Sequence, residues 1–178
     1  MGNYLLIPLL VIASLYSFTT SAQKGNEVII QKSFENGELF FIMPQEMETQ
    51  QKDIEFEADF TINYQKDQKQ PEKVQMNFTI FSEEPVKQLS SMLLLVNGQE
   101  KGVVRTFEKF YLEKKGRNTW AARFGARIDY DQLLSILNPE HEIRWVLKTI
   151  KEKIEISPAR KIKKEYEVAY QTLTYHFE

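Results

Sequence analysis

The sequence predicts an α+β fold, mainly antiparallel β in a sandwich-like or curved sheet. A short helix is expected near 130–137, and a C-terminal helix is expected to pack on the sheet. Three stretches carry this prediction, because apolar and polar residues alternate in 54–64, 74–81 and 119–128. Such a period of two is typical of strands with one face in water.

The three alternating stretches predict strands that cover a hydrophobic core. The polar segment 65–72 between the first two contains Pro71, which favours a hairpin loop. In 119–128 the apolar side chains share one face, while Arg123 and Arg127 lie on the other. We therefore expect a sheet with one dry face and one wet face.

Shorter patterns predict the remaining strands. Segments 27–34 and 38–44 flank Asn36-Gly37, a pair that favours a tight turn with positive φ. Residues 86–96 fit a buried strand or a short helix, and we favour the strand.

Later in the chain, residues 103–115 predict one strand with a bulge. The reason is that Phe107 and Phe110 fall on opposite parities. Segments 142–149 and 152–156 complete the predicted strands.

The short helix is expected to begin at Asp129, because Asp129 and Gln132 form a capping-box pattern ahead of several leucines. Asn138-Pro139 should end it, since the residue before a proline avoids helical geometry.

The C-terminal helix is expected to start with Ser157 as its cap and Pro158 in its first turn. Apolar residues then recur at helical spacing and form one stripe. The stripe consists of Ile162, Tyr166, Ala169, Tyr170, Leu173 and Phe177. The cations beside it, Arg160, Lys161, Lys163 and Lys164, are interpreted as a solvated shoulder of the helix rather than a binding site.

Residues 1–22 predict a secretory signal peptide, and residues 23–178 a single β-rich domain. The apolar run Tyr4–Leu15 is followed by small and hydroxyl residues that end at Ala22. The run is shorter than the about 20 residues that span a bilayer. We therefore expect an exported protein, periplasmic or secreted, with no stable membrane insertion after signal cleavage.

The amino-acid composition excludes several classes of function. The chain has no cysteine, which excludes thiol catalysis and cysteine-zinc sites and suits a bacterial envelope protein better than a disulfide scaffold. Its net charge of −2 provides no overall field to attract nucleic acid, so no nucleic-acid partner is expected.

No cluster with catalytic, cofactor-binding or metal-binding spacing emerges. In an extended segment Glu140 and Glu142 share a face and His141 points away, which spoils a metal site. Asp129 and Asp131 do not face one another at a helix start, which argues against an acid pair. We expect no catalytic residues, no cofactor and no metal.

Two charged groups remain as candidate docking patches. Glu55, Glu57 and Asp59 lie on the wet face of one strand, and Arg123 and Arg127 on that of another. If the strands are neighbours, these charges pair across the ladder. If the strands are apart, each group is a docking patch.

The sequence therefore favours an exported, non-catalytic domain that binds a protein or an envelope component through a sheet face or edge. The alternative is a small hydrolase that uses distant carboxylates on envelope glycans. A glycan site should place exposed aromatic residues beside acids, and most aromatic residues here lie on the inward parity.

Export has a direct test. We expect the mature protein to begin at Gln23, because Ala22 supplies the small residue that signal cleavage needs. Intact-mass measurement of protein from the cell envelope checks this. A retained segment 1–22 would indicate an anchor and contradict the export of a cleaved form.

Overall fold

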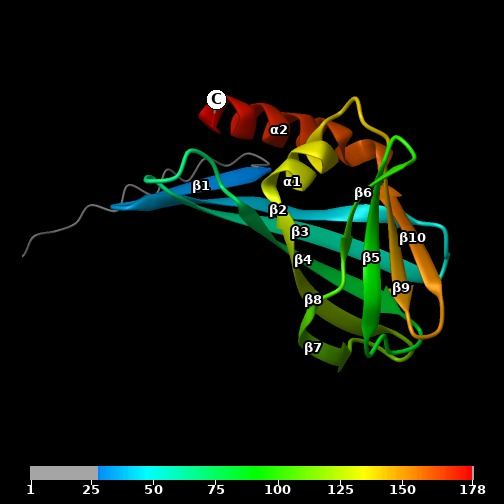
Figure 1. Cartoon of the computed structure of the whole chain (residues 1–178). Coiled ribbons are helices and arrows are strands. Elements are labelled where there is room, and N and C mark those ends of the chain that lie inside the picture. The colour runs from blue at the N-terminus through cyan, green and yellow to red at the C-terminus, as the bar shows by residue number, and fades with distance from the viewer. Residues whose placement is uncertain (1–27, 178) are drawn as a thin grey trace, which may run out of the picture.

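The computed structural model describes residues 28–177, which form one ten-stranded antiparallel sheet and two α-helices (Figure 1). The strands are β1 (Ile29–Phe34), β2 (Gly37–Thr49), β3 (Ile54–Gln65), β4 (Lys73–Ser82), β5 (Leu89–Val96), β6 (Gln99–Val104), β7 (Glu108–Lys114), β8 (Trp120–Asp129), β9 (Ile143–Thr149) and β10 (Lys153–Pro158). The helices are α1 (Tyr130–Leu137) and α2 (Lys163–Phe177), and a 3-10 turn, η1 (Arg160–Ile162), precedes α2. The predicted α+β class is confirmed. The predicted signal peptide lies outside the described residues.

The sheet is strongly curved. Its strand order is β6-β5-β9-β10-β2-β3-β4-β8-β7, and β1 pairs with β2 beside this path. Strand β6 nevertheless contacts β8, so the sheet curls until its two ends approach each other. Of the two arrangements that the sequence left open, the chain therefore has the curved sheet.

Aromatic side chains fill the concave side of the sheet. Phe78 stacks between two neighbours, with ring centroids 5.3 Å from Phe56 and 5.8 Å from Phe124. Trp145 reaches from β9 across the interior, and its ring lies 6.0 Å from that of Phe56 on β3. These side chains are at most 2% exposed. The interior is thus a packed core, and its aromatic contacts add to the stabilisation that burial alone provides.

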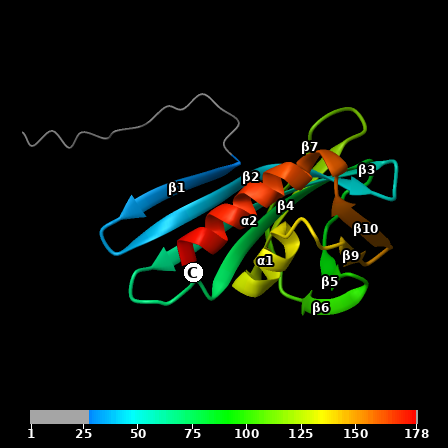
Figure 2. The same ribbon diagram turned by 90° about the horizontal axis from the view of Figure 1, so that it is seen from above.

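Helix α2 lies over the sheet with its apolar stripe inward, beside α1 (Figure 2). Ala169 and Leu173 are fully buried. The Tyr166 hydroxyl lies 3.8 Å from the sulfur of Met47 on β2, and burial raises the pKa of Tyr166. Tyr170 and Phe177 pack half-buried at the margin. The amphipathic stripe predicted from the sequence is therefore the contact between α2 and the sheet.

The short helix α1 forms as the capping pattern predicts. The backbone N–H of Asp129 donates to Oε1 of Gln132 at 2.9 Å, as in a capping box. At the other end the backbone N–H of Asn138 donates to the Leu134 carbonyl at 3.0 Å, and the helix ends there.

The predicted start of the C-terminal helix is wrong. Ser157 and Pro158 belong to β10, where they lie opposite Glu48 and Met47 of β2, and Ala159 precedes the first helical turn. A long-range strand pairing therefore overrides the local capping signal. Pro158 is the last residue of its strand, a position where the missing N–H costs little.

The hairpin predicted around Asn36-Gly37 is confirmed, but its turn is not the predicted turn with positive φ. The turn residues are Glu35 and Asn36, and Gly37 begins β2 with a φ that is not positive. Gly37 instead allows β2 to pass close to the backbone of β3, because a Cβ at this position would lie 2.3 Å from the Tyr64 carbonyl oxygen. The positive-φ turn is Asn97-Gly98, with φ of 51° and 76°, and it joins β5 to β6.

The structure tests the secondary structure predicted for two further segments. Residues 89–96 form a strand, as favoured over a helix. Residues 103–115 do not form one strand, because the chain leaves β6 at Val104 and starts β7 at Glu108 at the other end of the sheet. The bulge is present, since the β7–β8 register shifts at Phe110.

The packing of α2 predicts unequal effects of two substitutions. Leu173→Ala removes a fully buried side chain and should lower the free energy of unfolding by about 2–5 kcal/mol. The double variant Lys163→Gln/Lys164→Gln changes exposed side chains and should alter it by less than about 0.5 kcal/mol. Denaturant melts compare the two. A harmless Leu173→Ala would mean that α2 does not cover the sheet.

Candidate functional site

The convex face of β3, β4 and β8 carries most of the candidate residues. Strand β4 lies between the other two, so the acidic strand and the basic strand are not direct neighbours. Along one rung of the ladder, Asp59 lies opposite Asn77 and Asn77 opposite Gly125. On the next rung, Thr79 lies opposite Arg123. Any pairing of charge must therefore cross β4.

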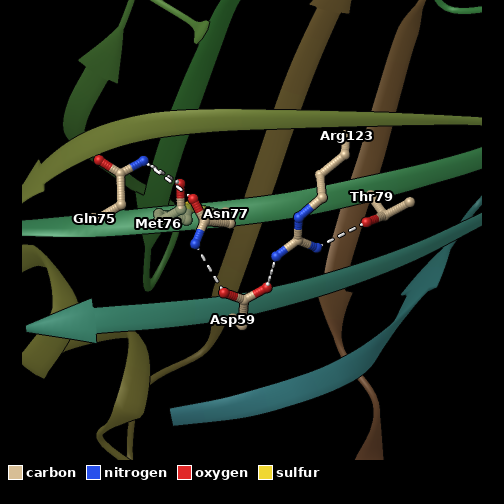
Figure 3. A network of polar contacts seen from close by, with 6 residues as sticks. All are labelled: Asp59, Gln75, Met76, Asn77, Thr79 and Arg123. Atoms are coloured by element: carbon tan, nitrogen blue, oxygen red, sulfur yellow. Dashed lines mark hydrogen bonds and ion pairs between the residues drawn. The ribbon is translucent and has the colours of Figure 1, made fainter. Parts of the chain in front are cut away.

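One pair does cross β4. The guanidinium of Arg123 donates to Oδ2 of Asp59 at 2.5 Å and to the hydroxyl of Thr79 at 3.0 Å. The other oxygen of Asp59 accepts from the side-chain amide of Asn77 at 2.9 Å, and Gln75 donates to Asn77 (Figure 3). The Asp59 and Arg123 side chains are only 15% and 27% exposed. This chain of polar contacts is therefore ordered and satisfied.

The remaining candidates form no ion pair. Glu57 lies on the same rung as Thr79 and Arg123, Glu55 lies opposite Phe81 toward one end of β3, and Arg127 lies opposite Gln75 toward the other end of β8. Among residues 28–177, none of these three side chains has an oppositely charged partner within 4.0 Å. The two sequence hypotheses thus each describe part of the face. Asp59 and Arg123 pair, and the other charges lie in two separate places.

The sequence predicts β4 as a strand but does not indicate that its polar side chains connect the other two strands. Gln75, Asn77 and Thr79 bridge the two charged strands, and all three lie on the wet parity of β4. The alternation in the sequence shows that these three residues share one face of β4. It does not show the strand register, which places them between Asp59 and Arg123. The signal that was available is the run of polar residues Gln75, Asn77 and Thr79 on one parity of β4, which ends at Phe81.

A second feature of the convex side is apolar. We call it the hairpin face, and it consists of Ile30 and Phe34 of β1 and Leu39 and Phe41 of β2. Ile30 lies opposite Phe41, while the alternate residue Phe40 is buried in the core. Phe34 is 58% exposed, and the other three are half-buried. Lys32 stands among them, with Nζ 5.9 Å from the centroid of the Phe41 ring.

Strand β1 is also an edge. Among residues 28–177 it pairs with β2 alone, in an unbroken register of six residue pairs. Its only charged residue is Lys32, and it contains no proline. The edge strand β7 differs, because four of its seven residues are charged and its register shifts at Phe110. Charges and bulges are the usual protection of an edge, and β1 largely lacks both.

The histidines take structural positions. Nδ1 of His141 lies 3.0 Å from the Ser135 carbonyl oxygen, so a proton on that nitrogen is donated to the end of α1. The ring of His176 packs edge-on against Phe40, with centroids 4.9 Å apart, and its Nε2 lies 2.5 Å from a carboxylate oxygen of Glu38. Within residues 28–177, no three His, Asp or Glu side chains are grouped so as to hold a metal ion.

The two helices of the described segment are too short or too polar to cross a membrane. Comparison of the chain with models of known protein families, with curated proteins and with solved structures finds no significant match. The chemistry of its own residues is therefore the basis for assigning a function.

The ordered network predicts a measurable coupling. In a double-mutant cycle, Asp59→Ala and Arg123→Ala should interact by about 1–3 kcal/mol, because the pair is shielded and each partner has further hydrogen bonds. The pair between Lys73 and Asp129, 61% and 54% exposed, is the control and should give about 0.2–1 kcal/mol. Equal couplings would contradict a special role for the shielded pair.

Proposed function

We propose that this chain is an exported, non-catalytic binding module that takes up an extended protein segment along β1. The observation that carries the proposal is an unprotected strand edge continuous with an exposed apolar face. An added strand gains main-chain hydrogen bonds from such an edge, and side-chain contacts select its sequence.

The exposure of β1 supports this. Its residues from Gln31 to Phe34 are exposed although the strand is regular. Seen from above, β1 lies at the margin of the molecule, and α2 lies between it and α1 (Figure 2). A six-residue strand held by one neighbour gains little burial of its own, and a partner strand would supply the missing contacts.

The side chains of β1 indicate what the partner carries. On the convex face Ile30, Lys32 and Phe34 present an apolar, a cationic and an apolar position. Paired residues of antiparallel strands share a face, so the partner segment should offer apolar, acidic and apolar side chains there. Such a segment covers the hairpin face and neutralises Lys32.

The state of Asp59 supports a non-catalytic role. Its side chain is 15% exposed, and its two carboxylate oxygens accept hydrogen bonds from Asn77 and Arg123. These contacts hold the carboxylate against β4 and β8, so it could approach a substrate only if they rearranged. Asp59 acts here as the centre of a structural network.

Photo-crosslinking in the producing cell tests the proposal. A photoreactive phenylalanine replaces Phe34 at the edge or, as a matched control, Ile150, which is 72% exposed in the turn between β9 and β10. We expect one partner protein to be captured from position 34 and not from position 150. The crosslinked peptide of that partner should contain alternating apolar and acidic residues.

Purified partner then gives a quantitative check. The double variant Ile30→Lys/Phe34→Lys should weaken binding at least tenfold, whereas Ile150→Lys should change it less than twofold. Thermal melts confirm that both variants remain folded. Equal capture from both positions, or unchanged binding of the double variant, would overturn the proposal.

A further inference from the structure

A hollow of about 560 Å³ lies on the seam where the two ends of the curved sheet approach each other. We call it the seam hollow. Its charged lining consists of Lys73, Arg105, Glu108, Arg127 and Asp129. Strand β7 pairs with β8 only as far as Gly125, so the following residues of β8 have no strand partner on the seam side. The hollow is therefore bordered by an open stretch of β8 and by the connection from β6 to β7.

Two guanidinium groups in the seam hollow have no carboxylate partner. Arg105 comes from the β6–β7 connection and Arg127 from β8. Within residues 28–177 neither lies within 4.0 Å of an acidic side chain, whereas Lys73 is paired with Asp129. Glu108 remains as a single free carboxylate. Two guanidiniums against one carboxylate leave the hollow with a positive balance.

The rest of the lining suits a ligand larger than a bare ion. Thr106 offers a hydroxyl and Gln75 an amide, while Val103, 38% exposed, offers an apolar surface. Phe110 stands at the rim, because a Cβ on Gly125 would lie 2.7 Å from its ring. The Glu108 carboxylate can accept hydrogen bonds from hydroxyl groups of a ligand. It would repel a ligand that carries only anionic groups.

We propose that the seam hollow binds an oxyanion, carboxylate or phosphate, between Arg105 and Arg127. The planar fork of arginine donates two parallel hydrogen bonds to such a group, which makes it the favoured side chain for this recognition. The anion is carried on a polyhydroxy molecule, whose hydroxyls reach Glu108 and Thr106. This site is separate from the edge of β1 and independent of the function proposed for it.

Nuclear magnetic resonance of the arginine side chains tests this site in the full mature protein. The probes are inorganic phosphate, galacturonic acid and, as the neutral counterpart, galactose. The Nε–Hε signals of Arg105 and Arg127 should shift and saturate with an anionic probe. Arg117 and Arg160 lie outside the seam hollow and have no ion pair among residues 28–177, so their signals should drift without saturation.

Variants complete the test. Arg127→Gln should abolish the saturable shift at Arg105, and the matched variant Arg117→Gln should leave it intact. Saturation by galacturonic acid but not galactose supports the proposed anion on a polyhydroxy molecule, whereas saturation by phosphate alone would contradict the polyhydroxy ligand and leave a site for small phosphate. If neither phosphate nor galacturonic acid gives a saturable shift, or if Arg117 and Arg160 respond equally, the proposal is overturned.

Discussion

The packing of Trp145 against β3 is the interaction on which the rest of the structure depends. Trp145 stands on β9 in one arm of the curved sheet, and its ring meets Phe56 and Phe60 on β3 in the other arm. Because these rings fill the concave side, the two arms are held together without a disulfide. Helix α2 then covers the remaining apolar surface. A filled interior leaves the convex face and the edges as the surfaces available for recognition.

Local patterns predicted most of the strands and both helices, because burial on one face leaves a period in the sequence. Predictions failed where a long-range contact decides the local structure. Ser157 and Pro158 look like a helix start but pair with β2, and Gly37 looks like a turn residue but lies against the Tyr64 carbonyl. The break near Arg105 was hidden as well, since the residues on either side of it belong to strands at opposite ends of the sheet.

The contacts between charged residues on the surface were only partly predictable, for a related reason. Parity assigns a side chain to a face, but the register decides which charges meet. Asp59 and Arg123 were predicted as candidates, yet their contact depends on the intervening strand β4. The hairpin face could have been predicted from the sequence, because the run from Leu39 to Ile42 is apolar on both faces of the strand. One parity fills the core, and the other is half-buried beside an open edge.

The tightly packed core of this protein carries an edge strand whose contacts are incomplete. Hydrogen–deuterium exchange of the free protein tests this difference, because amide protection reports the free energy of local opening. We expect the amides of β3, β4 and β9 to exchange only through global unfolding. Those of β1 should exchange at least a hundredfold faster. Protection of β1 equal to that of β3 would contradict the account.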